Sequence, residues 1–93
     1  MEYAYNSKSL GRHGVCISDV NEILAMNNVT TREFDMPLSG SDNLRIMFVG
    51  YTFAGCLVEI GVEFMSEHQA YVFHGQTVSP KYRKLYQERI GNE

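Results

Sequence analysis

The sequence predicts an α+β fold in which N-terminal helices precede an antiparallel β-meander and a C-terminal helix packs on the sheet. Three observations predict this class. Apolar residues recur at helical spacing within residues 18–28, residues 56–64 alternate with the period of a strand, and Ser79-Pro80 restarts the chain as a helix. A chain of 93 residues can bury one core and is too short for two, so we expect a single domain over residues 1–93.

Two helices and a short strand are expected in the N-terminal third. Tyr3–Tyr5 alternates with small residues and suggests the strand. Asn6 is a suitable N-cap for a brief helix through Leu10. Ser18 is expected to cap a second helix, which ends at Asn27-Asn28. Three apolar residues of this helix share one face: Val20, Ile23 and Leu24.

The central prediction is a hairpin joined at Phe53-Ala54-Gly55. It follows Val29–Phe34, which has the composition of a strand, and a loop over residues 35–43. A three-residue turn with glycine in the left-handed conformation pairs Arg45 with Glu63 and keeps one face apolar, which fixes the register. That face carries Leu44, Ile46, Phe48, Val58, Ile60, Val62 and Phe64.

A second hairpin is expected at Ser66–Gln69, with a four-residue loop. The register counted back from it gives four pairs: Phe64 with Tyr71, Val62 with Phe73, Gly61 with His74 and Glu59 with Gln76. Tyr71 and Phe73 are therefore expected on the core face. His74 and Gln76 are expected on the polar face, with the glutamates.

The polar face predicts a candidate catalytic site for RNA cleavage without metal or cofactor. Attack of a 2′-hydroxyl on phosphorus needs a base, an acid and a cation. Glu59 or Glu63, His74 and Arg45 supply these groups, with Gly61 leaving open space beside the histidine. The alternative is structural: Arg45 and Glu63 form an ordinary cross-strand ion pair, and the histidine is a hydrogen-bonded strand residue. The histidines show no metal-ligand spacing.

The C-terminal helix has a docking face and a basic face. Ser79 at the N-cap and Pro80 at the first position are typical of a helix start. The docking stripe follows helical spacing: Tyr82, Leu85, Tyr86, Arg89 and Ile90. Lys81, Arg83 and Lys84 are left toward solvent, either as a solvated face or as a patch that steers RNA to the polar face.

Composition argues against several classes of protein. No run of about 18 apolar residues is present, so we expect no membrane span. The N-terminal residues lack the apolar segment of a secretory signal. Cys16 and Cys56 lack a metal or CxxC spacing, which favours reduced thiols in a cytoplasmic protein over a disulfide. The net charge of −3 argues against a domain that coats nucleic acid through phosphate contacts alone.

Several strings together resemble one known family. Lys8 and Arg12-His13-Gly14 precede an amphipathic helix, a strand starts with arginine and reaches a glycine turn over Arg45–Gly55, and a strand leads into a helix over Val72–Tyr86. In this order they resemble BrnT, the toxin family of a type II toxin–antitoxin system. The resemblance spans nearly the whole chain, and the first and last strings are its most specific parts.

The resemblance implies a RelE-like fold, a ribonuclease activity that halts translation, and a cognate DNA-binding antitoxin protein as partner. Arg45 matches the arginine at the start of the family's second long strand, which implies a phosphate-binding role. The chain departs from the family at two places. Tyr51 follows Val49-Gly50 where a basic residue is usual, and the segment His74-Gly75-Gln76-Thr77 lacks the usual basic pair.

Two main hypotheses remain open at this point. In the first, the protein is a ribonuclease toxin in which His74 works with Tyr51 and Gln76, which contact RNA in place of the basic residues. In the second, catalysis has been lost and the same fold serves as a protein-interaction module. A structural homodimer is a third hypothesis, supported only by the acidic charge.

Overall fold

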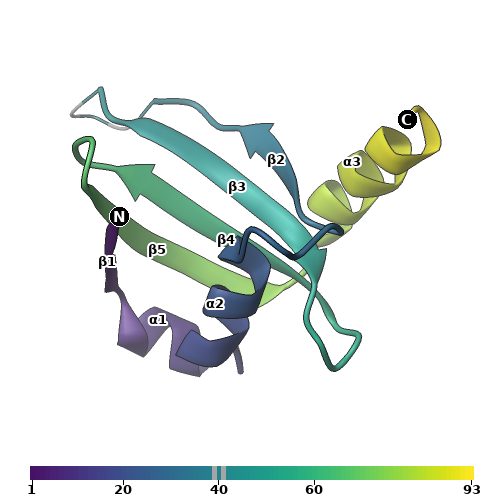
Figure 1. Ribbon diagram of the computed structural model, residues 1–93, viewed down its shortest axis with the longest axis horizontal. Helices are drawn as coiled ribbons and strands as arrows, with labels where there is room; N and C mark the ends of the chain where they lie inside the picture. The colour runs from purple at the N-terminus through teal and green to yellow at the C-terminus, as the bar shows by residue number, and fades with distance from the viewer. Residues whose placement is uncertain (39, 41) are drawn as a thin grey trace.

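Five strands form one mixed sheet in the computed structural model, which describes residues 1–38, 40 and 42–93. The strands lie in the order β1-β5-β4-β3-β2 (Figure 1). Strands β2 to β5 form the predicted antiparallel meander, and β1 extends its edge parallel to β5. In chain order the elements are β1 (Glu2–Tyr5), α1 (Ser7–Arg12), α2 (Ile17–Leu24), β2 (Arg32–Asp35), β3 (Leu44–Tyr51), β4 (Leu57–Phe64), β5 (Gln69–Thr77) and α3 (Pro80–Gly91).

The predicted α+β class, with N-terminal helices and a C-terminal helix on the sheet, is confirmed. The sheet is mixed because the strand expected at residues 3–5 is parallel to β5. Of the loop expected at residues 35–43, Ser39 and Ser41 lie outside the described residues. Within the described part of the chain, every helix is too short or too polar to cross a membrane.

The helix ends differ in part from the prediction. Asn6 caps α1 as expected, because its Oδ1 accepts a hydrogen bond from the backbone N–H of Ser9 at 3.1 Å. Helix α2, however, is capped by Cys16 and not by Ser18. The reason is Asp19, whose carboxylate accepts the backbone N–H of Cys16 at 3.0 Å and so fixes the first turn two residues earlier.

Helix α2 also ends earlier than predicted, at Leu24. Asn28 does not extend the helix, because its side-chain amide donates hydrogen bonds to the carbonyls of Glu22, at 2.8 Å, and Tyr51, at 3.0 Å. Thr31 donates its hydroxyl hydrogen to the carbonyl of Ile23 at 2.7 Å. These bonds hold residues 28–31, with a turn at residues 29 and 30, against α2 and β3, so β2 starts at residue 32 and not at residue 29.

The first predicted hairpin, between β3 and β4, is confirmed. Arg45 pairs with Glu63, and Thr52 donates its N–H to the carbonyl of Cys56 at 2.9 Å, which closes a three-residue loop. Gly55 has φ +87°, the left-handed conformation that glycine adopts at little cost. The alternation of residues 56–64 was therefore sufficient to fix this register.

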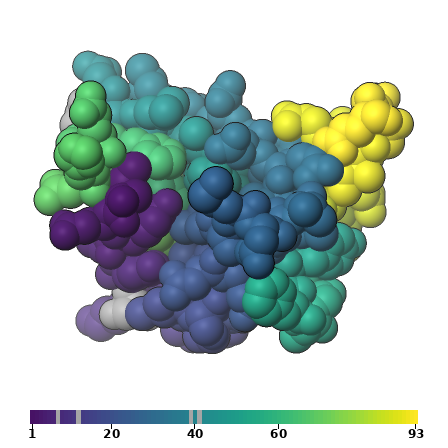
Figure 2. All heavy atoms as spheres, viewed as in Figure 1, coloured from purple at the N-terminus to yellow at the C-terminus, as the bar shows by residue number. Residues whose placement is uncertain are grey.

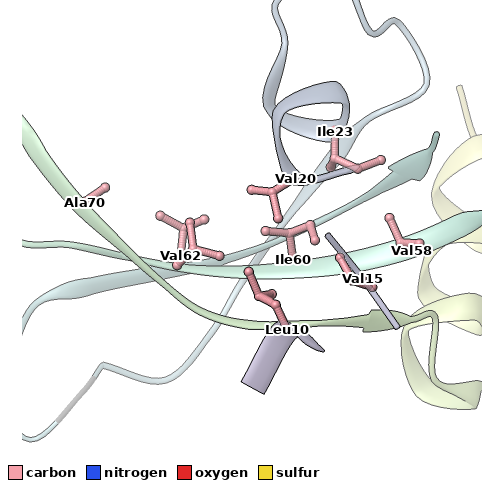
Figure 3. Packing of buried hydrophobic residues seen from close by; sticks show 9 residues of the cluster. Leu10, Val15, Val20, Ile23, Val58, Ile60, Val62 and Ala70 are labelled. Atoms are coloured by element: carbon pink, nitrogen blue, oxygen red, sulfur yellow. The ribbon is translucent and has the colours of Figure 1, made fainter. Parts of the chain in front are cut away.

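Helices α1 and α2 cover the apolar face of the sheet. Figure 3 shows Leu10 and Val15 meeting Ile60 from one side, and α2 meeting it from the other. The buried members of this cluster are Leu10, Val15, Val20, Ile23, Val58, Ile60, Val62, Ala70 and Val72. A fully buried side chain of this size contributes about 1.5–3 kcal/mol, so this cluster is a main source of stability. In the view of Figure 2, α2 and the segment that follows it lie in front of the sheet, and α1 lies at its lower edge.

The second hairpin, between β4 and β5, differs from the prediction near its loop. The N–H groups of Met65 and Ser66 both donate to the carbonyl of Gln69, so the loop is one residue shorter than expected. Phe64 therefore pairs with Ala70 and not with Tyr71. A β-bulge opposite Gly61 and Val62 then adds one residue to β5 and restores the predicted pairs: Gly61 with His74 and Glu59 with Gln76.

The bulge changes which side chains face the core. Tyr71 and Phe73 were predicted on the apolar face, and this prediction is wrong. Ala70 and Val72 occupy that face, and Tyr71 lies opposite Glu63 on the other one. The pattern could not show this, because β5 is apolar at four consecutive positions, 70–73, which include the bulge.

Helix α3 packs on one end of the opposite face (Figure 1). Ser79 caps it as predicted, accepting the N–H of Tyr82. The buried cluster beneath it contains Phe34, Met47, Val49, Leu57, Val78, Tyr82 and Tyr86. Arg89 lies over the Phe34 ring at 4.5 Å, as the docking stripe predicts. Ile90, predicted in that stripe, is 43% exposed because the helix end projects beyond the sheet.

Candidate functional site

The polar face of the sheet lies beside the end that α3 covers. Glu59, Gly61 and Glu63 alternate along β4 and so share this face, with successive side chains about 7 Å apart. The register places Arg45 beside Glu63 and His74 beside Gly61. The four predicted catalytic residues are thus brought to one face, where they form two separate pairs.

The first pair joins His74 to Glu59. The Nε2 atom of His74 lies 2.8 Å from Oε2 of Glu59, and the backbone N–H of Ser79 donates to Oε1 at 2.6 Å. Glu59 is 3% exposed, so its carboxylate is buried with both oxygens occupied. The His74 side chain is 26% exposed, so the imidazole can be reached from solvent while the carboxylate cannot.

Glu59 is held in its ionised form. Burial raises the pKa of the Glu59 carboxyl, but the hydrogen bonds from His74 and Ser79, together with the nearby His74 charge, outweigh burial and leave the pKa below its ordinary value. An ionised carboxylate only accepts hydrogen bonds, so Nε2 of His74 carries the hydrogen of this bond. In the neutral imidazole, Nδ1 then carries the free lone pair, which is the arrangement of a general base oriented by a carboxylate.

The second pair joins Arg45 to Glu63. The Nε of Arg45 lies 3.5 Å from Oε1 of Glu63, and it is buried with no hydrogen-bond partner among the described residues. The side-chain amide of Asn43 donates to the other Glu63 oxygen at 3.1 Å. The Arg45 guanidinium carbon lies 3.9 Å from the centre of the Phe73 ring, a cation–π contact. Arg45 is therefore oriented by a ring and a carboxylate.

The Phe73 ring fills the space expected to be open beside His74. A Cβ built on Gly61 would lie 2.8 Å from Cζ of Phe73, so the ring covers the glycine. This is a consequence of the bulge, which turns Phe73 to the polar face. The prediction of open space at Gly61 is wrong: the glycine admits an aromatic ring on which Arg45 stacks.

A second histidine, His13, lies beside His74, although the sequence pattern predicts no role for it. The rings of His13 and His74 have centroids 6.2 Å apart and planes inclined by 54°. His13 is the C-cap of α1, with its backbone N–H on the carbonyl of Leu10 at 3.1 Å, and its side chain is exposed. Glu59, His74 and His13 thus follow one another as a buried carboxylate, a half-buried imidazole and an exposed imidazole.

Close packing of α1 on β5 places His13 there. A Cβ on Gly75 would clash with Cδ2 of Leu10, so the helix approaches the strand at a position without a side chain. The two histidines are 61 residues apart in the sequence, and no local spacing predicts their approach. The available signal is the Arg12-His13-Gly14 string, which is part of the resemblance but predicts no chemistry by itself.

The predicted RNA-binding residues lie around α3 and the adjoining strand ends. Lys81, Arg83 and Lys84 are exposed, and the Nζ of Lys81 lies 5.3 Å from the Tyr82 ring. Tyr51 is 42% exposed, with its ring 6.0 Å from Tyr86. Gln76 is half-buried and pairs with Glu59 in the sheet. Because Glu59 also accepts the backbone N–H of Ser79, helix α3 with its basic residues starts directly beside the His74–Glu59 pair.

Over the described ranges, no group of three or more His, Cys, Asp or Glu side chains is placed to hold a metal ion. The groups available to a substrate at this site are the His74 imidazole, the neighbouring His13 imidazole from α1, the Arg45 guanidinium and the basic residues of α3. Such a set binds anions and transfers protons. In comparisons with known proteins, no family model and no curated protein matches the chain.

Proposed function

We propose that this protein is a toxin-like small ribonuclease with a RelE-like fold, which cleaves RNA without a metal ion and is neutralised by a cognate antitoxin. One observation carries the proposal: a solvent-accessible His74 is held by a buried, ionised Glu59 on the same sheet face as Arg45. The resemblance to BrnT supports the same activity and the antitoxin as partner.

In the proposed reaction, His74 acts first. Its neutral Nδ1 takes the proton of an RNA 2′-hydroxyl, and the oxygen attacks the adjacent phosphorus. Glu59 holds the ring in the required orientation and stabilises the imidazolium that forms. A positioned base of this kind contributes about 10²–10⁴-fold to the rate. Glu59 is thus a positioning residue, because its buried oxygens cannot touch the substrate.

Arg45 supplies positive charge for the phosphorane. Its ion pair with Glu63 is long at 3.5 Å, and its side chain is 27% exposed although Nε is buried, so the exposed part of the guanidinium can bind a phosphate oxygen at small cost to the pair. Glu63 and Phe73 keep the guanidinium in place before RNA binds. Lys81, Arg83 and Lys84 steer the phosphate backbone toward the site, and the exposed Tyr51 ring offers a surface on which a base can stack.

Expression in a bacterial host tests this proposal in cells. Induced wild-type protein is expected to arrest growth, and His74→Ala and Arg45→Ala are expected to relieve the arrest. His68→Ala is the matched control, because His68 lies in the exposed turn after β4. Arrest by both site variants equal to that by wild type, at equal protein level, would show that this site is not responsible.

A second candidate function is a protein-interaction module with the same fold. The observation that favours it is that Arg45, Glu59 and Glu63 all have partners within the protein, an arrangement that also suits a structural role. In this function α3 or the free edge of β2 binds a protein partner. Purified protein that cleaves RNA, with cleavage lost in His74→Ala, would rule this function out. A neighbouring gene for a ribbon-helix-helix protein would favour the toxin.

A further inference from the structure

The proposed reaction requires a proton donor for the leaving 5′-oxygen, and the predicted carboxylates are unsuited to this task. Glu59 is buried with both oxygens occupied. Glu63 accepts a hydrogen bond from Asn43 on one oxygen and faces the Arg45 guanidinium with the other, so both of its oxygens are engaged within the protein. His74 is already used as the base. The acid must therefore come from outside the predicted set.

The structure assigns this role to His13: we infer that its imidazolium is the general acid that protonates the leaving oxygen, so that His13 and His74 act on opposite sides of one phosphate. This inference rests on the ribonuclease function proposed above. The ring centroids are 6.2 Å apart, and each imidazole reaches about 2.6–3.2 Å further through a hydrogen bond. The two rings can therefore contact different oxygens of the same phosphodiester.

The proton balance of this reaction is complete. The 2′-oxygen forms a bond to phosphorus while its proton moves to Nδ1 of His74. The bond from phosphorus to the 5′-oxygen breaks, and that oxygen receives a proton from the His13 ring. The products are a 2′,3′-cyclic phosphate and a 5′-hydroxyl. His74 is then protonated and His13 neutral, and exchange with water restores the starting state.

The fold explains why the acid is carried by the α1 C-terminus. The helix is fixed at its start by Asn6 and packs through Leu10 on Gly75, one residue from His74. His13 follows directly at the C-cap, and its exposed ring lies 6.2 Å from the His74 ring. Glu59 supports His74 from the buried side. One imidazole is thus held for accepting a proton and the other is open to solvent, from which it recovers one.

Substrates with different leaving groups test the inference. One substrate is a diribonucleotide, whose 5′-oxygen needs a proton to leave. The other is uridine 3′-(4-nitrophenyl phosphate), whose nitrophenolate leaves without one. His13→Ala is expected to lower the cleavage rate of the diribonucleotide by about 10²–10⁴-fold and to cleave the nitrophenyl ester at nearly the wild-type rate. His74→Ala is expected to lose both activities, and His68→Ala neither.

The pH profile gives a second readout that a merely structural role would not change. Wild type is expected to show a bell-shaped rate with pH, and His13→Ala to lose the fall on the alkaline side, where the acid would lose its proton. Thermal melting verifies that the variant is folded. The acid role would be overturned if folded His13→Ala lost the same factor in cleavage rate on both substrates, or if its rate on the diribonucleotide were unchanged. Either result would leave the ribonuclease proposal intact. Absence of cleavage by wild type would overturn both.

Discussion

Replacement of Glu59 by glutamine tests the buried pair at the centre of the site. The carboxylate accepts two hydrogen bonds, from His74 at 2.8 Å and from the N–H of Ser79 at 2.6 Å. An amide has one oxygen that accepts and one nitrogen that donates, so it can keep the bond from Ser79, but the charge-assisted bond to His74 is lost or is replaced by a neutral bond to the other tautomer. A hydrogen bond to a buried charged group is worth about 1.5–3 kcal/mol. We therefore expect Glu59→Gln to lower the free energy of unfolding by about 2 kcal/mol.

The measurement is equilibrium unfolding in urea at neutral pH, followed by circular dichroism. In a domain of this size, about 2 kcal/mol also lowers the melting temperature by about 8–16 °C. Glu63→Gln is the matched control, because the Arg45–Glu63 pair is long and partly exposed and so is worth less than about 1 kcal/mol. A change below about 0.5 kcal/mol in Glu59→Gln, or an equal change in Glu63→Gln, would show that the buried His74–Glu59 pair does not stabilise the fold in this way.

Three further predictions concern acid stability and two glycines. The pKa of Glu59 is lower in the folded protein than in the unfolded chain, so its ionised form stabilises the fold above about pH 4.3. This stabilisation is lost as the pH falls through the folded pKa. Between about pH 6 and about pH 3, urea titrations should therefore show a smaller loss of unfolding free energy in Glu59→Gln than in wild type. Gly75→Ala forces a methyl group against Leu10 and should cost about 1–3 kcal/mol of unfolding free energy. The control Gly11→Ala has open space around it in α1 and should be neutral or stabilising. Equal effects of the two substitutions would contradict the close packing of α1 on β5. Gly55→Ala, at φ +87°, should cost about 1–2 kcal/mol in the same assay, and no loss would show that the loop has another conformation.

The sequence predicted the parts of the fold that follow a simple period. The alternation in residues 56–64 and the glycine at position 55 were sufficient for the register between β3 and β4, and hence for the pairing of Arg45 with Glu63. The predicted register of β5 is correct at His74 only because two differences from the prediction cancel. Its loop is one residue shorter than predicted, and a bulge of one residue compensates for the difference.

The site was predictable only where the sheet register determines it. His74, Glu59, Arg45 and Glu63 share one face, as expected, but their division into two pairs depends on the Phe73 ring. The position of that ring depends on the bulge, which leaves no signal in an apolar run. Whether these residues carry catalysis stays a prediction, and so does the RNA-binding role of the basic face of α3.

The approach of His13 to His74 could not be read from the sequence. It depends on how closely α1 packs against β5, and a single missing side chain at Gly75 sets that distance. Periodicity identifies the buried side of a helix but not its depth against a sheet. Tertiary packing therefore added a residue to the candidate site that local pattern had left without a role.

The ends that purified protein leaves on RNA test most directly whether His74 catalyses RNA cleavage. Wild-type protein incubated with a ribo-oligonucleotide in excess chelator is expected to produce 2′,3′-cyclic phosphate and 5′-hydroxyl ends. Cleavage should be lost in His74→Ala, retained in His68→Ala, and absent at any position where the 2′-hydroxyl is replaced by hydrogen. Cleavage by His74→Ala at the wild-type rate, or ends that carry a 5′-phosphate, would contradict this role of His74.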